Sequence, residues 1–215
     1  MSRRNPSAPS KVANFYHNRC GWEAKDAEKA WKARGARAGE VRGGGRHSLS
    51  GVQTRRFLTG ARQQGGSVGA ALQFALYTGL RLSELVAARW SQLQHQDWYG
   101  TKRLCLHVLG KGQKWRWVPL DRRAERVLAL CPRGEWLFPG VKGHIAASTV
   151  QAACKRMRES EPTLALLTPH VLRHTYTTKR VSECVNPEEL KAALGHDSIN
   201  TTLVYVGSLG WKRKP

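Results

Sequence analysis

Three short strand-like runs lie close together in the middle of the chain, and this group constrains the fold more than any other feature. The runs are rich in aromatic and branched residues, and they occupy residues 90–94, 103–109 and 115–120. In the third run, Trp115 and Trp117 alternate with charged side chains, which is the period of a strand with two different faces. A Gly-Lys-Gly sequence between the second and third runs is typical of a hairpin turn. We therefore predict a small antiparallel sheet.

Segments with the spacing of amphipathic helices lie on both sides of these runs. Before them, apolar residues between 49 and 58 fit one helix face, a helix over residues 67–78 is expected to end at Gly79, and a short helix opens at residue 82. After them, helices are expected over residues 122–130, 147–159, 169–182, 187–194 and 200–206. Helices, one small antiparallel sheet and more helices make an α+β fold that is mostly helical.

The balance of charge indicates a polyanionic partner. The 215 residues include 36 Lys and Arg against 15 Asp and Glu, which gives a formal net charge of +21. Such a charge attracts nucleic acid first and an anionic membrane surface second. Hydrophobic residues make up 40% of the chain. This fraction supports a buried core and excludes a wholly disordered chain.

The first 46 residues differ in composition from the rest. They hold eleven Lys and Arg against four acidic residues, and five glycines fall between residues 35 and 45. We expect residues 1–46 to form a partly disordered basic arm, with a helix near residues 22–34 and a glycine hinge. Residues 47–215 are expected to form the folded domain. The arm is either a solvated tail or a segment that lies along a phosphate backbone.

The cysteines and the apolar segments indicate an intracellular protein. The five cysteines are widely spaced and never form a C-x-x-C pair, which argues against a disulfide framework or a zinc ribbon and for a reducing compartment. The N-terminus lacks the apolar stretch of a secretory signal. The longest nearly apolar stretch, residues 68–80, is shorter than the ~20 residues needed to cross a bilayer. We therefore expect a soluble, cytoplasmic protein.

Several polar residues occur in contexts that suggest chemistry, although none is specific by itself. Arg81 follows the helix-ending glycine, where an arginine is usually a surface cation or a partner of Glu84. Lys111 lies at the tip of the predicted hairpin, where a lysine is usually solvated. His196 and Tyr205 come near the end of the chain, and a tyrosine in a Thr-Leu-Val-Tyr-Val run is usually part of a core.

One predicted helix carries both His170 and Arg173. Pro169 suits its first turn, and the i, i+3 spacing puts His170 and Arg173 on one face. His170 and His174 also have the i, i+4 spacing of zinc ligands on a helix. The glutamate of the H-E-x-x-H motif is missing and no third ligand is evident, so the sequence disfavours a zinc site.

Together, these residues resemble the catalytic set of the tyrosine recombinase, or phage integrase, family. The set is Arg81, Lys111, His170, Arg173, His196 and Tyr205. The surrounding segments TGLRLSEL, GKGQKWRWVPL, TPHVLRHT and LGHDSINTTLVYV also resemble segments of that family, over about residues 48–206. The resemblance implies a mostly helical catalytic domain with a small antiparallel three-stranded sheet.

The resemblance implies how the reaction begins. Tyr205 would attack a DNA phosphodiester and form a 3′-phosphotyrosyl intermediate with a free 5′-hydroxyl. A phenol needs help at neutral pH because its pKa is about 10, and His170 would act as its acid–base partner. Lys111 would protonate the departing 5′-oxygen, which requires a cation that can lose its proton.

The resemblance also implies how charge on the phosphate is stabilised. Arg81 and Arg173 would bind the non-bridging oxygens with their planar guanidinium groups. His196 would donate a hydrogen bond to a phosphoryl oxygen, and Glu84 would hold the site in register. Since side chains supply the positive charge and the phosphotyrosine keeps the ester energy, no metal, ATP or other cofactor is expected.

The function implied is that of a site-specific DNA recombinase or integrase of a phage or other mobile element. Its partners would be double-stranded DNA, further copies of the chain in a homotetramer on synapsed DNA, and an accessory DNA-binding or directionality protein. Members of the family usually carry a helical DNA-binding domain ahead of the catalytic one, and only 46 residues occupy that place here. Autonomous recombination therefore stays open. The alternatives are a type IB topoisomerase-like enzyme, a non-catalytic DNA-binding remnant of an integrase and, more remotely, a basic membrane-surface protein.

Overall fold

The computed structural model of the chain describes residues 19–21, 47–110, 112–141 and 143–196. Contacts within the chain divide it into two compact units. The larger unit comprises Arg46–Thr177 and Ala192–Gly195, and the smaller unit comprises Met1–Gly45, Thr178–Lys191 and His196–Pro215. The helices expected near residues 22–34 and 200–206 lie outside the described residues.

Local signals set the ends of the helices of the larger unit. These helices are α3 (Gly51–Gln64), α4 (Gly66–Thr78), α5 (Leu82–Val86), α6 (Arg122–Ala129) and α7 (Ala147–Ser160). Ser50 begins α3 with a capping box, in which its hydroxyl accepts from Gln53 N and its own N–H donates to Gln53 Oε1. Asp121 caps α6 by accepting from the N–H groups of the next turn. The helices predicted in these regions are confirmed.

Two further helices have the bounds that the sequence predicts. They are α8 (Pro169–Ser182) and α9 (Pro187–Leu194). Each begins with a proline, which is pre-organised for the first helical position and needs no hydrogen-bond acceptor there. The larger unit contains α8 up to Thr177 and the last turn of α9 from Ala192.

The sheet is antiparallel, with the order β1-β2-β3, and it confirms the α+β prediction. Its strands are β1 (Leu93–Trp98), β2 (Thr101–Leu109) and β3 (Trp115–Pro119). Trp98 pairs with Thr101, so β1 and β2 are joined by a two-residue turn. Both turn residues, Tyr99 and Gly100, have positive φ angles of 49° and 78°, as hairpin turns of this length require. Leu109 pairs with Trp115 at the next turn.

The first strand was predicted too early in the chain, over residues 90–94. Trp90–Gln92 form a short 3-10 helix, and the strand begins at Leu93. The reason is tertiary: Trp90 donates its backbone N–H to Glu135 O and its indole N–H to Pro132 O. These two bonds hold Trp90 against a distant segment, and they override the strand propensity of an aromatic residue.

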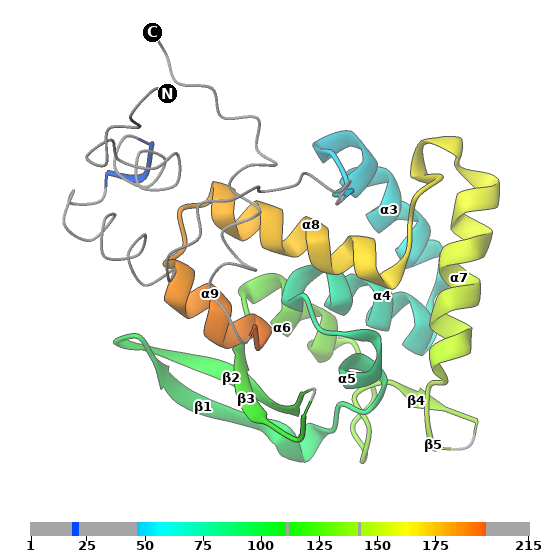
Figure 1. The fold of residues 1–215 in the computed structure, drawn as a ribbon. Coiled ribbons are helices and arrows are strands. Elements are labelled where there is room, and N and C mark those ends of the chain that lie inside the picture. The colour runs from blue at the N-terminus through cyan, green and yellow to red at the C-terminus, as the bar shows by residue number, and fades with distance from the viewer. Residues whose placement is uncertain (1–18, 22–46, 111, 142, 197–215) are drawn as a thin grey trace, which may run out of the picture. The chain divides into compact units, whose positions relative to one another are not determined.

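The core of the larger unit lies between the sheet and the helices. In Figure 1, α3, α4 and α7 lie together and the sheet lies below them. Phe74 on α4 and Phe138 are both fully buried, with ring centroids 5.4 Å apart. Leu106 and Val118 contribute to the same core from β2 and β3. Smaller elements around this core are β4 (Pro139–Gly140), β5 (Gly143–His144) and η2 (Pro162–Leu164).

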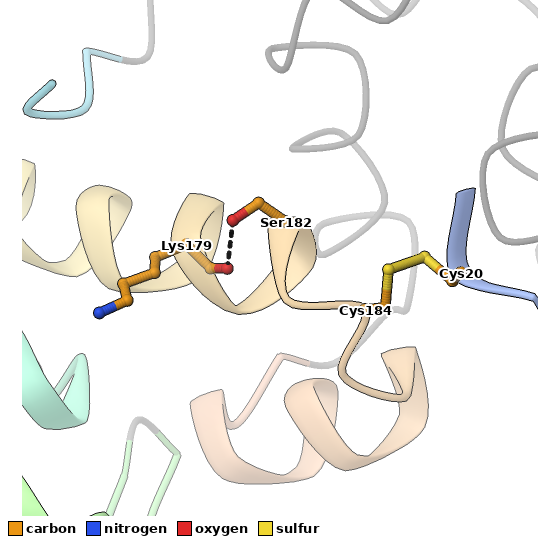
Figure 2. The surroundings of a disulfide bond; sticks show 4 residues. All are labelled: Cys20, Lys179, Ser182 and Cys184. Atoms are coloured by element: carbon orange, nitrogen blue, oxygen red, sulfur yellow. Dashed lines mark hydrogen bonds between the residues drawn. A yellow bond between two sulfur atoms is a disulfide. The ribbon is translucent and has the colours of Figure 1, made fainter. Parts of the chain in front are cut away.

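In the smaller unit, a disulfide bond joins Cys20 to Cys184 (Figure 2). The expectation that the cysteines stay unpaired is therefore wrong for this pair, while Cys105, Cys131 and Cys154 are free thiols. A separation of 164 residues hides the pairing from any local pattern. Beside the bond, the Ser182 hydroxyl donates to Lys179 O at the end of α8 (Figure 2).

No helix in the described part of the chain combines the length and the apolar character needed to cross a membrane.

Candidate active site

The turn between α4 and α5 positions Arg81. Gly79 ends α4 with a left-handed conformation (φ 66°), and a Cβ atom there would lie 2.4 Å from Cδ1 of Tyr176. After this reversal, Arg81 is the N-cap residue of α5. Its backbone N–H donates to Glu84 Oε2 and its Nη1 donates to Glu84 Oε1, each at 2.8 Å. Both parts of Arg81 are thus bound by one carboxylate.

Glu84 is a buried carboxylate between two arginines. Its side chain is 2% exposed. From β3, Arg116 donates through Nη1 to Oε1 at 2.8 Å and through Nη2 to Oε2 at 2.7 Å, which is a bidentate ion pair. Burial alone raises the pKa of Glu84, but the hydrogen bonds from Arg116 and Arg81 outweigh it and lower the pKa to about 2. Glu84 is therefore ionised at neutral pH.

Arg173 is buried on α8 and is 5% exposed. Its Nη1 donates to Gly79 O and its Nη2 donates to Leu194 O, both at 2.7 Å. These bonds tie the end of α4 to the end of α9. They also fix the plane of the guanidinium, as a group that binds a phosphate in a defined orientation requires.

Three consecutive carbonyl groups at the end of α9 each accept from a different arginine. The pairs are Ala193 O with Arg116 Nε at 2.8 Å, Leu194 O with Arg173 Nη2 at 2.7 Å, and Gly195 O with Arg81 Nη2 at 3.3 Å. The last carbonyls of a helix have no partner within it and carry partial negative charge, which favours cations. This carbonyl row therefore gathers three arginines at one place.

Gly195 is required at the end of this row. Its φ angle is 62°, in the region that glycine adopts without strain. A Cβ atom there would lie 2.8 Å from Cδ of Arg116 and 3.0 Å from its Nε. The Leu-Gly-His segment identified in the sequence therefore has a structural role besides supplying His196.

His170 lies at the exposed start of α8. Its ring contacts that of His174 edge-on, with centroids 4.3 Å apart, so the two histidines do share a face. Over the described residues, no group of three or more His, Cys, Asp or Glu side chains is arranged to hold a metal ion.

The remaining predicted site residues are placed only in part. His196 belongs to the smaller unit, where its backbone N–H donates to Lys191 O at 3.2 Å. Lys111 and Tyr205 lie outside the described residues. Lys111 lies in the turn of the β2–β3 hairpin, between Gly110 and Lys114, and the backbone N–H of Gly110 donates to Lys114 O at 2.8 Å.

The structure thus brings together Arg81, Glu84 and Arg173, and it adds Arg116, which sequence reasoning missed as a site residue. The available signal was the alternation in the third run, which put Arg116 on the face opposite Trp115 and Trp117. That pattern did not show which carboxylate the arginine meets, because Glu84 is 32 residues away in the sequence.

Comparisons with known proteins agree with this architecture. Tyrosine recombinase XerC of Xanthomonas campestris pv. campestris (strain B100) is 32% identical over 143 residues, which cover 63% of this chain and 42% of that protein. The chain spans less than half the length of the curated relatives it matches.

Solved structures share the fold. XerA recombinase superposes with a TM-score of 0.59 at 20% identity, over 98% of this chain and 85% of that chain. A lambda integrase dimer bound to a COC′ core site gives a TM-score of 0.62 at 18% identity, over 94% of this chain and 65% of that chain. At these identities, the likeness establishes a common fold. The model of the phage integrase family matches residues 48–209, which is well over half of the sequence, and the chain therefore belongs to the phage integrase family.

Proposed function

We propose that the chain is the catalytic part of a site-specific DNA recombinase, which breaks and rejoins DNA through a 3′-phosphotyrosyl intermediate. The observation that carries this proposal is that Arg81, which Glu84 binds, and Arg173 donate to adjacent carbonyl groups at the end of α9 in a member of this family. Two guanidiniums held by protein acceptors, that of Arg173 buried and that of Arg81 partly exposed, are pre-organised donors for the negative charge of a pentacoordinate phosphorus.

Each candidate residue has a proposed part in the reaction. Arg81 and Arg173 bind the non-bridging oxygens, and His196 adds a hydrogen bond to the phosphoryl group. Tyr205 Oη attacks phosphorus and forms the phosphotyrosyl bond, while the bond to the 5′-oxygen breaks.

Proton transfer accompanies this exchange. His170 takes the proton from the phenol of Tyr205, and Lys111 gives a proton to the departing 5′-oxygen. In the second step the reverse transfers accompany attack by a 5′-hydroxyl, which restores the tyrosine. Because one ester replaces another, the proposed reaction consumes no ATP, and because the arginines supply the positive charge, it needs no metal.

The proposed partner is double-stranded DNA, in a cytoplasmic setting and in the service of a phage or other mobile element. The formal charge of +21 supports this proposal, because Lys and Arg that neutralise phosphates release counterions. The logarithm of affinity should fall with the logarithm of salt concentration, with a slope of roughly −0.9 for each phosphate contacted. Residues 1–46 would act as a basic arm and residues 47–215 as the catalytic domain. A homotetramer on synapsed DNA and an accessory DNA-binding or directionality protein complete the proposal.

A covalent-adduct assay tests the chemistry. The purified protein is incubated in EDTA without ATP with nicked duplexes from the flanks of its own gene, and SDS-resistant protein–DNA species are resolved on a gel. We expect an adduct with the wild type and with the control variant Tyr99→Phe, which changes an exposed tyrosine of the β1–β2 turn, and no adduct with Tyr205→Phe.

The other outcomes separate the alternatives. DNA binding without any adduct, even with a supplied helical DNA-binding domain, contradicts the proposal and favours a non-catalytic binder. An adduct accompanied by relaxation of supercoiled plasmid, with no exchanged strands, favours the topoisomerase-like alternative.

A further inference from the structure

Arg116, which the sequence did not identify as a site residue, makes three hydrogen bonds in the candidate site. Its side chain, on β3, is 10% exposed. Its three donor positions point to protein acceptors: Nη1 and Nη2 to the two oxygens of Glu84, and Nε to Ala193 O. The guanidinium is thus bound to the protein itself at all three of its donor positions, and two of them bind the charged oxygens of Glu84.

The contacts of Glu84 show what Arg116 contributes. Oε1 accepts from Nη1 of Arg81 and Nη1 of Arg116, and Oε2 accepts from the backbone N of Arg81 and Nη2 of Arg116. A carboxylate has about four lone-pair sites, and these four bonds use them. Arg116 thus holds the carboxylate from the side of the sheet while Arg81 is bound on the other side. Without Arg116, the carboxylate of Glu84 would be free to rotate towards Arg81, and this rotation would change the direction of the Arg81 guanidinium.

The third contact extends the same effect to the end of α9. Ala193 O, which accepts from Arg116, adjoins Leu194 O and Gly195 O, which accept from Arg173 and Arg81. One strand residue therefore fixes two groups, a carboxylate and a row of carbonyls, that in turn orient both arginines.

We infer that Arg116 is a positioning residue of this site, which aligns Arg81 through Glu84 and aligns the carbonyl row through Ala193. The inference rests on the proposed function only where it is tested by the rate of adduct formation. The orientation of Arg81 can be measured on the protein without DNA. Lysine cannot replace it, since an ammonium lacks the planar fork that binds both oxygens of Glu84 and the separate Nε–H that binds Ala193 O.

The first experiment follows the arginine side chains directly. The ¹⁵N–¹H signal of Arg81 Nε is assigned by its loss in Arg81→Lys and is then compared in the wild type, Arg116→Lys and the control Arg122→Lys, which changes an exposed residue of α6. We expect the Arg81 signal to shift or broaden in Arg116→Lys and to stay unchanged in the control. An unchanged Arg81 signal in a folded Arg116→Lys protein would overturn the inference, whatever the protein does to DNA.

The second experiment separates positioning from general stability. Arg116→Lys should lower the single-turnover rate of adduct formation by roughly 10- to 100-fold, as a small misplacement of a catalytic group does, while the DNA dissociation constant changes by less than about twofold. The loss should be non-additive with that of Glu84→Gln, because both changes act through the same contact. A single-turnover rate within about twofold of the wild type, or rate losses that are strictly additive with those of Glu84→Gln, would contradict the inference.

Failure of the proposed function is a distinct outcome. If the wild type forms no adduct, the proposed chemistry is refuted, while the Arg81 signal still decides the role of Arg116. If Arg116→Lys does not fold, Arg116→Gln replaces it, because this variant leaves Glu84 and its two bonds to Arg81 in place while it removes the bidentate contact from β3. The same change in the Arg81 signal is then expected, and its absence counts against the inference.

Discussion

The buried carboxylate of Glu84 should make the protein lose stability in acid. Burial alone raises its pKa, but hydrogen bonds from Arg116 and Arg81 lower it to about 2, against 4.5 for an ordinary glutamate. A lowered pKa means that the ionised group stabilises the folded state. This contribution is complete above the unfolded pKa of 4.5, and it is lost as the pH falls from there towards 2.

The structure gives the size of the effect. A difference between 4.5 and about 2 corresponds to about 3 kcal/mol of unfolding free energy, at about 1.4 kcal/mol for each pH unit. Because the Glu84 side chain is 2% exposed, solvent screening reduces this value little. Of the total, about 2 kcal/mol should be lost by pH 3.

Urea unfolding of the wild type and Glu84→Gln, followed by tryptophan fluorescence between pH 7 and pH 3, measures this contribution. Glutamine cannot ionise, so the difference in unfolding free energy between the two proteins should shrink by about 2 kcal/mol over that range. In Glu159→Gln, which changes a carboxylate that is 61% exposed, the difference from the wild type should stay constant within about 0.5 kcal/mol. A difference between wild type and Glu84→Gln that is the same at pH 7 and pH 3 would refute the reasoning.

Three substitutions test the packing around the site, each by chemical denaturation. Gly79→Ala should lower the free energy of unfolding by at least about 2 kcal/mol, because alanine is strained at a φ of 66° and its Cβ would lie 2.4 Å from the Tyr176 ring. A decrease below about 0.5 kcal/mol would contradict the left-handed turn at the end of α4. Gly195→Ala should lower the free energy of unfolding by a similar ~2 kcal/mol and should displace Arg116, whose Cδ would lie 2.8 Å from the new methyl group. An unchanged free energy of unfolding would show that Arg116 does not pack against Gly195. Phe74→Ala should cost about 3–5 kcal/mol, since the ring is fully buried, and a surface-like cost below about 1 kcal/mol would remove Phe74 from the core.

Local signals predicted the helices well and the first strand poorly. The bounds of α8 and α9 follow from Pro169, Pro187 and Gly195, whose backbone preferences act within a few residues. Trp90 is different, because its two hydrogen bonds to the segment around residues 132–135 depend on the folded chain. The pairing of Cys20 with Cys184 depends on it in the same way.

The residues of the candidate site also differ in whether a local segment or the folded chain reveals them. The resemblance to a known family identified Arg81, Glu84 and Arg173 because each stands in a recognisable local segment. It did not identify the third arginine, since the sequence of β3 shows only that Arg116 lies opposite two tryptophans. The ion pair with Glu84 and the bond to Ala193 O arise from three separate segments that meet in the fold.

Identification of the amino acid that becomes attached to DNA tests the central claim most directly. The adduct trapped on a nicked duplex is digested with nuclease and trypsin, and the peptide that carries the residual nucleotide is sequenced by mass spectrometry. The account predicts a nucleotide joined through its 3′-phosphate to the peptide of residues 192–212, in which Tyr205 is the sole tyrosine. A nucleotide on another peptide, or one joined through its 5′-phosphate, would contradict the account.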